Sequence, residues 1–243
     1  MIKYFTLKIL NIFDFFHQRR IIKYLHKKGF KSFENILDVG AHKGESINLF
    51  LSNFKIKTIY SFEASPMTFK ILSDKIDYFR NKFKSSKIII ENYAIGAAKK
   101  KVLLKQLKES SSSTIRNLNE NSKYLKKKLF FLQVENKGSF FEEAEVDQIT
   151  LSDYLFKNNI HNVDFLKIDT EGYEFEVLMG AKEVLFKIGI ILFEHHYDDM
   201  IDKNYKFSDV HNFLLTNHFS QLFKVKMPFR KTFEYIYINK LKK

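Results

Sequence analysis

The chain has 243 residues, of which 45% are hydrophobic, and its formal net charge is +13. This length and hydrophobic content fit one compact domain with a sizeable core. Because the chain contains no Cys, disulfides, structural Cys–zinc sites and thiol catalysis are excluded, and we expect a cytoplasmic protein.

The positive charge is concentrated at the two ends of the chain. Residues 1–31 contain eight Lys or Arg against one acid, Asp14, and residues 224–243 contain seven against Glu234. These ends carry +7 and +6, which leaves residues 32–223 neutral. The sequence therefore does not favour a nucleic-acid groove across the body of the protein.

Residues 1–31 are predicted to form an amphipathic helical extension, as one helix or a helix pair. Apolar residues recur at helical spacing between Lys and Arg, and they include Ile2, Phe5, Ile9, Phe13 and Phe16. Charged residues interrupt the segment too often for a membrane span, and no signal-peptide cleavage site follows. Two interpretations remain open: a cap packed on the following domain, or a helix peripherally bound to the inner membrane surface.

Residues 32–243 are predicted to form one Rossmann-like domain. Short apolar runs alternate with helical periods, as in parallel βαβ units. Before residue 99 we expect strands at 35–40, 57–63 and 87–96, with helices at 45–53 and 66–82.

Residues 99–148 break this alternation with the polar run ESSSSTIRNLNENSKYLKKK and are predicted as an excursion from the domain. The Ser110–Thr114 run within it is either a substrate lid or a solvated turn. After the excursion we expect strands at 163–168 and 189–193 and helices at 173–185 and 207–216. The strands expected at 221–226 and 233–238 would form an antiparallel hairpin that closes the sheet.

Acidic residues end four of the predicted strands, at Asp38, Glu63, Asp169 and Glu194. In open parallel sheets, ligands bind outside the carboxyl ends of the strands. Four acids at that edge suggest a ligand that carries positive charge.

The loop DVGAHKGE after the first strand predicts a binding turn for the polar end of a ligand. Its Gly40, Ala41 and Gly44 precede a helix whose N-terminal amides can hold an anionic group, but His42 breaks the dinucleotide fingerprint. Glu63 follows Gly44 at the spacing typical of a ribose-binding acid. S-adenosylmethionine fits this combination, because it has a ribose, a carboxylate and two positive centres.

The order of the motifs resembles the FkbM family of S-adenosylmethionine-dependent methyltransferases. The blocks that carry the resemblance are LDVGAHKGES, IYSFEASP, ENYAIG, ITLSDYL, VDFLKIDTEGYEFEVLMGA and IILFEHH. The resemblance implies a class I methyltransferase fold, with a seven-stranded, mostly parallel sheet and helices on both faces. It also implies O-methylation of a hydroxyl on a sugar or a related small molecule, as in polysaccharide biosynthesis.

Within that framework each motif residue receives a predicted role. For the cofactor these are Gly40, Ala41 and Gly44 near the methionine part, Asp38 at its ammonium, Glu63 at the ribose, Ala94 at the adenine and Glu171 near the reacting region. Methyl transfer from a sulfonium needs alignment of the acceptor and a base for the hydroxyl proton. The candidate bases are Asp169, His195 and His196.

Three alternatives stay open at this stage. Asp169, Glu171, Glu194 and His195 would form a divalent-metal site if they converged, which is not favoured because they come from different strands. A nucleic-acid methyltransferase would use the basic ends, but the Pro-Pro-aromatic turn common in base N-methylation is replaced by Asp-Thr-Glu-Gly. A non-catalytic membrane or nucleic-acid binding protein on the same scaffold is the third. The acceptor and the oligomeric state are not determined.

Overall fold

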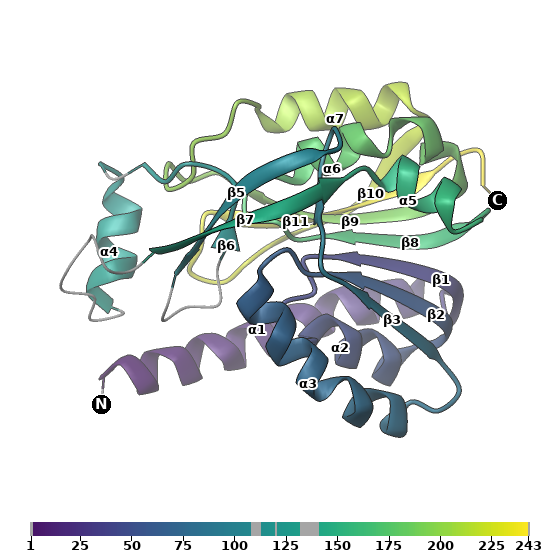
Figure 1. The fold of residues 1–243 in the computed structure, drawn as a ribbon, viewed down its shortest axis with the longest axis horizontal. Helices are drawn as coiled ribbons and strands as arrows, with labels where there is room; N and C mark the ends of the chain where they lie inside the picture. The colour runs from purple at the N-terminus through teal and green to yellow at the C-terminus, as the bar shows by residue number, and fades with distance from the viewer. Residues whose placement is uncertain (1, 108–112, 120, 132–140, 243) are drawn as a thin grey trace.

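A seven-stranded sheet forms the centre of the protein in a computed structural model that describes residues 2–107, 113–119, 121–131 and 141–242 (Figure 1). The order of its strands is β10-β11-β9-β8-β1-β2-β3. In chain order the strands are β1 Ser32–Val39, β2 Lys55–Phe62, β3 Lys87–Glu91, β8 Val163–Ile168, β9 Ile188–His196, β10 Phe219–Lys226 and β11 Thr232–Asn239.

The pairing of these strands confirms the predicted mostly parallel sheet. Strands β3, β2, β1, β8 and β9 run parallel to one another, whereas β11 is antiparallel to both β9 and β10. The strand order reverses at β1, which has β2 on one side and β8 on the other. A crevice at the carboxyl ends of β1 and β8 is therefore the expected place for a ligand.

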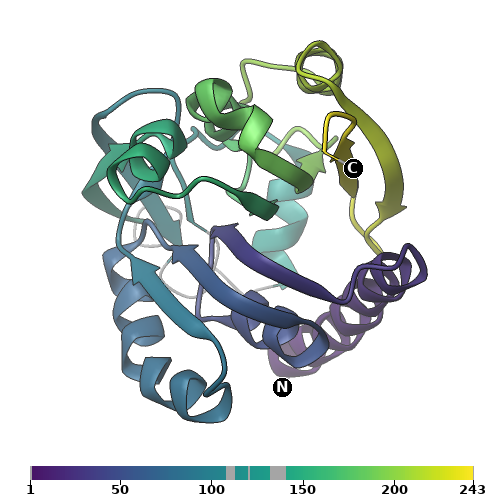
Figure 2. The ribbon, with the colours of Figure 1, turned by 90° about the vertical axis from the view of Figure 1, so that its right-hand side faces the viewer.

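Helices cover both faces of the sheet, as the turned view shows (Figure 2). One face carries α1 Ile2–Lys27, α2 Glu45–Asn53 and α3 Pro66–Lys82, and the other carries α5 Leu151–Lys157, α6 Glu174–Gly180 and α7 Phe207–Thr216. Strands covered on both faces read as continuous apolar runs. Accordingly, Phe165 of β8 packs into the core on the α2 side, while its neighbour Leu166 packs into the core on the α5 side.

The strands described within the excursion belong to a second, four-stranded sheet. Its order is β4-β7-β5-β6, and its strands are β4 Ala94–Ile95, β5 Lys100–Leu107, β6 Ser113–Thr114 and β7 Phe141–Ile149. A further helix, α4, spans Lys123–Phe131. In the Ser110–Thr114 run, residues 110–112 lie outside the described part of the chain.

Two predicted elements are divided in the structure. The strand expected at 87–96 becomes β3 in the large sheet and β4 in the small one. Between them, the side-chain amide of Asn92 donates hydrogen bonds to the carbonyls of Glu63, at 2.8 Å, and Ala64, at 3.2 Å. The helix expected at 173–185 becomes α6 and a 3₁₀ helix, Lys182–Lys187.

Helix α1 is a single helix whose second half packs on the large sheet. Its Ile21, Ile22 and Leu25 are buried in the same core as strand residues. The ring of Tyr24 stacks on Phe223 with centroids 4.0 Å apart, and its hydroxyl donates to the carbonyl of residue 222 at 2.7 Å. This packing agrees with the predicted helical cap. None of the helices in the described ranges is long and apolar enough to cross a membrane.

Candidate active site at the carboxyl ends of β1 and β8

A cavity of about 360 Å³ lies at the carboxyl ends of β1, β2 and β8. This volume is within the range of small-molecule sites, about 300–1,000 Å³. One end is formed by the turns after β1 and β2 and by β4, and the other by β6, the turn after β8, α1 and the hairpin. The residues that the argument uses are Gly40, Ala41, His42, Glu63, Tyr93 and Ala94 at the first end, and Asp14, Gln18, Thr114, Lys167, Asp169, Glu171 and Arg230 at the second.

The glycine loop is held tightly between two neighbouring strands. The amides of Gly40 and Ala41 both donate to the carbonyl of Phe62 at 2.9 Å, and the amide of Asp169 donates to the carbonyl of Val39 at 3.0 Å. Gly40 has φ +83°, and a Cβ there would lie 1.8 Å from the carbonyl oxygen of Asp169. Only glycine therefore allows the turns after β1 and β8 to approach this closely.

Gly44 begins α2 at the other end of this loop. It has φ +90° and is the residue before the first helical turn, but it does not line the cavity. A Cβ there would lie 2.6 Å from the ring of Phe79 on α3. Gly44 therefore serves the packing of the loop, while Gly40, Ala41 and His42 face the cavity.

Glu63 is buried immediately after β2 and lines the cavity, with 5% of the residue exposed. Its Oε2 accepts from the amide of His42 at 2.8 Å, and its Oε1 accepts from the amide of Ser65 at 2.9 Å. Burial raises the pKa of Glu63, although these two hydrogen bonds act in the opposite direction. Each carboxylate oxygen keeps acceptor capacity for one more donor, so a ligand with two adjacent hydroxyls fits here.

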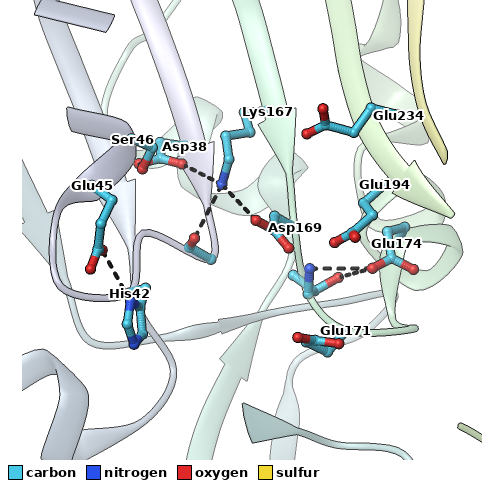
Figure 3. A network of polar contacts seen from close by, with 12 residues as sticks. Asp38, His42, Glu45, Ser46, Lys167, Asp169, Glu171, Glu174, Glu194 and Glu234 are labelled. Carbon is cyan, nitrogen blue, oxygen red and sulfur yellow. Dashed lines mark hydrogen bonds and ion pairs between the residues drawn. The ribbon is translucent and has the colours of Figure 1, made fainter. Parts of the chain in front are cut away.

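Asp38 lies beneath the cavity and is paired with Lys167 (Figure 3). It is fully buried and is not among the lining residues. Its Oδ1 lies 3.2 Å from the Lys167 ammonium, and its Oδ2 accepts from the Ser46 hydroxyl at 2.5 Å. The structure thus differs from the expectation that Asp38 faces a ligand ammonium, because a protein ammonium already takes that contact.

Lys167, which the sequence reasoning did not single out, connects the two ends of the site. Its ammonium lies 3.4 Å from Oδ2 of Asp169 and donates to the carbonyl of Gly40 at 3.2 Å. Burial alone would lower the pKa of Lys167, but the carboxylates of Asp38 and Asp169 outweigh it and raise that pKa above its usual value. The available signal was spacing, since residues 167 and 169 lie on the same side of an extended chain.

Asp169 presents a carboxylate to the cavity, with 42% of its side chain exposed. Glu194 of β9 lies close enough to influence its ionisation. Partial burial acts to raise the pKa of Asp169, but the Lys167 ammonium, assisted by Glu194, outweighs it and lowers the pKa. Burial, supported by the nearby Asp169 charge, raises the pKa of Glu194 to about 8 despite the opposing effect of His196. At neutral pH the pair therefore combines a protonated Glu194 with an ionised Asp169.

His195 and His196 point to opposite faces of β9, because side chains alternate along a strand. His195 packs on the α7 side, with its ring 4.8 Å from Tyr197 and 5.6 Å from Phe207. Burial lowers the pKa of His195 to about 3. Its imidazole is neutral but does not line the cavity, which differs from its predicted role as a base.

His196 points to the side of the acidic turn but is enclosed by carboxylates. Its Nε2 lies 3.4 Å from Glu171 and 3.7 Å from Glu194, and its Nδ1 lies 3.6 Å from Asp198. Burial alone would lower the pKa of His196, but these three carboxylates raise it well above the usual value. The imidazole is thus already protonated at neutral pH, which differs from its predicted role as a base.

The turn Asp169–Gly172 depends on a second residue absent from the predictions, Glu174. This fully buried carboxylate accepts from the amides of Thr170, at 3.2 Å, and Gly172, at 2.9 Å, and from the Tyr205 hydroxyl at 2.7 Å. On the other side, the Thr114 hydroxyl donates to the carbonyl of Glu171 at 2.8 Å. The turn holds Glu171 in a left-handed conformation, φ +48°, where the residue lines the cavity.

Ala94, the last of the predicted site residues, also lines the cavity, as do Asp14 and Arg230. Ala94 lines the cavity from β4 of the small sheet, beside Tyr93. At the opposite end, Arg230 of the hairpin turn forms an ion pair with Asp14 of α1 at 2.8 Å. No sequence pattern marks this pair, since 216 positions separate the two residues.

A divalent-metal site has no support in the described residues, among which no group of three or more His, Asp or Glu side chains is placed to hold an ion. The four residues considered from the sequence divide between two faces of the sheet. Glu194 lies on the side of Asp169, whereas His195 lies among aromatic rings on the other side.

Comparisons with known proteins agree with this geometry. The family model described as the methyltransferase FkbM domain matches residues 38–224. A solved FkbM methyltransferase from Methylobacillus flagellatus KT aligns with 85% of this chain, at 15% identity and a TM-score of 0.55. The chain spans 44% of the length of that protein. Magnesium protoporphyrin IX methyltransferase from Synechocystis PCC 6803, solved with bound S-adenosylmethionine, aligns with 96% of this chain over 82% of its own length, at 10% identity and a TM-score of 0.53. The comparison with curated proteins found no match.

Proposed function

Because the chain belongs to the FkbM methyltransferase family, we propose that it transfers a methyl group from S-adenosylmethionine to a hydroxyl of a sugar or a glycan-related small molecule. One observation carries the proposal. A single cavity joins a glycine loop and a buried acid, Glu63, to a half-exposed carboxylate, Asp169. The first pair suits the cofactor, and Asp169 suits a hydroxyl acceptor.

The residues at the first end of the cavity fit S-adenosylmethionine. Glu63 has acceptor capacity left on both carboxylate oxygens for the two ribose hydroxyls. His42 has a buried Nε2 without a hydrogen-bond partner, which is available to a polar group of a ligand. Tyr93 and Ala94 provide a flat, mostly apolar wall suited to adenine. A solved methyltransferase of the same fold binds this cofactor, which supports the assignment.

At the second end, Asp169 is the group that we assign to the acceptor hydroxyl. When bound, S-adenosylmethionine would supply an electrophilic methyl group on its sulfonium. Lys167 pairs with the Asp169 carboxylate at 3.4 Å, which orients that carboxylate and keeps it ionised. A weak base is sufficient, because the hydroxyl becomes far more acidic as its oxygen bonds to the methyl carbon. Asp169 would thus orient the acceptor and receive its proton.

His196 and Glu171 have supporting roles in this proposal. The His196 imidazolium offsets the charge of Glu171 behind the reacting region. The carboxylate of Glu171 lies on the same turn as Asp169 and lines the same cavity. A second hydroxyl of a sugar is a suitable partner for Glu171, since sugars present adjacent hydroxyls and a carboxylate accepts hydrogen bonds from them.

No observation on the described residues favours methylation of a nucleic acid. Residues 32–223, which hold the cavity apart from its Asp14, Gln18 and Arg230 border, have no net charge. The turn after β8 is closed by Thr114 and Glu174 and lacks the prolines associated with base N-methylation.

Calorimetry with S-adenosylmethionine and its demethylated product tests the cofactor assignment. We expect both to bind, and Glu63→Gln to weaken both by about 1.5–3 kcal/mol, because a charged acceptor of two hydroxyls is lost. The matched control is Glu183→Gln, an exposed acid on the 3₁₀ helix, which should bind as the wild type does. If neither compound binds to the folded wild-type protein, the proposed function is wrong.

Mass-shift screening of sugar, nucleotide-sugar and glycan acceptors with methyl-labelled cofactor tests the acceptor class. The expected product carries one labelled methyl on oxygen. RNA and DNA are included in the same screen. If they receive the labelled methyl group and the glycans do not, the result favours the nucleic-acid alternative instead.

A further inference from the structure

Exposed aromatic rings gather where α1 meets the turn between β10 and β11. Phe15 and Phe16 of α1 are 51% and 57% exposed, and Phe229 of the turn is 75% exposed. Single exposed rings are common on protein surfaces, but exposed rings that form one contiguous group are typical of interaction sites. Together with Phe13, Arg19 and Arg20 they form what we call the aromatic–basic patch.

The members of the patch are contiguous although they come from the two ends of the chain. The rings of Phe13 and Phe229 meet edge to face with centroids 4.8 Å apart. Phe13 and Phe16 are helical neighbours at positions i and i+3, and the rings of Phe15 and Phe16 lie 5.8 Å apart. The Arg19 guanidinium lies 4.9 Å from the centroid of the Phe15 ring.

The charge around the patch has one sign. Residues 15–31 and 224–233 contain no Asp or Glu. Arg19, Arg20 and Lys23 of α1 and Lys231 beside the turn are all exposed. Asp14 and Glu234 beside the patch are engaged with Arg230 and His17, and Glu171 and Glu194 act on Arg230 from the side of the cavity. The surface around the rings is therefore cationic, so an anionic partner is complementary to it.

The patch also borders the cavity. Asp14, Gln18 and Arg230 line the acceptor end of the cavity, and each is adjacent in sequence to a member of the patch. Figure 2 shows α1 next to the hairpin of β10 and β11. A surface that covers the patch would thus lie next to the opening through which an acceptor enters.

We propose that the aromatic–basic patch docks the protein on an anionic membrane surface, with the acceptor end of the cavity beside the lipid headgroups. Aromatic rings with interspersed Lys and Arg on an exposed helix face are typical of helices that lie in the membrane interface. The rings enter the headgroup region, and the cations pair with lipid phosphates. This placement favours an acceptor carried on a lipid over one free in solution, an inference that rests on the proposed function.

Single tryptophan variants test the docking directly, because the natural chain has no Trp. We expect Phe229→Trp and Phe16→Trp to shift their emission to shorter wavelength with vesicles of equimolar phosphatidylcholine and phosphatidylglycerol, and not with phosphatidylcholine alone. The matched control is Phe186→Trp, which replaces a ring that is 61% exposed beside Lys187. An equal shift for Phe186→Trp, or no shift for Phe229→Trp, overturns the proposal.

Vesicle sedimentation of the full chain gives the second measurement. The triple variant Phe15→Ser, Phe16→Ser, Phe229→Ser should bind anionic vesicles roughly tenfold or more weakly, because it loses the three rings that would be buried in the headgroup region. Phe156→Ser with Phe186→Ser, which removes exposed rings elsewhere, should bind as the wild type does. Unchanged binding of the triple variant contradicts the proposal, as does binding of a single-stranded RNA in place of vesicles. Calorimetry with S-adenosylmethionine on the same variants separates this result from a failure of the proposed function.

Discussion

The two ends of the cavity are built in different ways. The cofactor end comes from consecutive strand-to-helix turns, where Glu63 accepts from the amide of His42 and the carbonyl of Phe62 accepts from Gly40 and Ala41. The acceptor end joins segments that are distant in sequence. Its lining comes from Asp14 of α1, Thr114 of β6, Asp169 after β8 and Arg230 of the hairpin turn.

Different interactions therefore set the shape of each end of the cavity. Backbone hydrogen bonds and a glycine conformation set the shape of the cofactor end, so local sequence is sufficient to define it. Charge pairs between packed elements set the acceptor end, as in the Lys167 contacts with Asp38 and Asp169 and the Asp14–Arg230 pair. A change at the acceptor end should therefore alter turnover while cofactor affinity stays nearly constant.

Asp169→Asn tests that separation with the largest expected effect. Asn keeps the shape of the side chain but is not a base, so turnover on a hydroxyl acceptor should fall by about 10²–10⁴-fold. The measurement is the rate of S-adenosylhomocysteine formation with an acceptor found by the screen. Cofactor affinity by calorimetry should change only a few-fold. A comparable loss of cofactor affinity would show that the two ends are not separable.

Gly40→Ala tests the close approach between the two ends. The new Cβ would meet the carbonyl oxygen of Asp169 and would also occupy a positive φ, so unfolding free energy should fall by about 2–5 kcal/mol. Gly29→Ala is the control, because Gly29 has φ +90° with nothing within 4 Å of a Cβ, and about 1–2 kcal/mol is expected. Urea unfolding of both variants gives the comparison, and equal losses would show that the close approach is unimportant.

The pH dependence of stability tests the buried acid at the acceptor end. The pKa of Glu194 rises from 4.5 to about 8 in the folded protein, so the folded state binds more protons than the unfolded state between these values. The stabilisation that Glu194 contributes is then full below about pH 4.5 and is lost as pH rises through 8, and the raised pKa of His196 acts in the same direction. We expect a loss on the order of 1–3 kcal/mol across this window by urea unfolding.

Glu194→Gln should remove most of that slope, because the neutral amide has no proton to lose. Glu34→Gln replaces an acid that is 68% exposed and should leave the slope unchanged. A slope that persists in Glu194→Gln would assign the pH dependence to other groups and would make Glu194 an ordinary structural residue.

The sequence was informative wherever one local pattern decided the outcome. Alternating apolar runs and helical periods predicted the large parallel sheet and its hairpin, and the spacing of the glycine loop and Glu63 predicted their common cavity. The prediction failed where two patterns overlapped. The run at 87–96 reads as one strand, but Asn92 turns the chain from one sheet into the other. His195 and His196 look equivalent in the sequence. In the structure, the alternation of side chains along β9 points them to opposite faces of the sheet.

The sequence by itself therefore indicated the family, through the order of its motifs, and the position of the acids at one edge of the sheet, through periodicity and short-range spacing. The tertiary structure alone decided what each acid does. Asp38 faces Lys167 across neighbouring strands, Glu194 keeps its proton because it is buried against Asp169, and Arg230 reaches the cavity because the hairpin packs on α1. Burial and charge pairing depend on neighbours that lie far apart along the chain, and no local pattern records them.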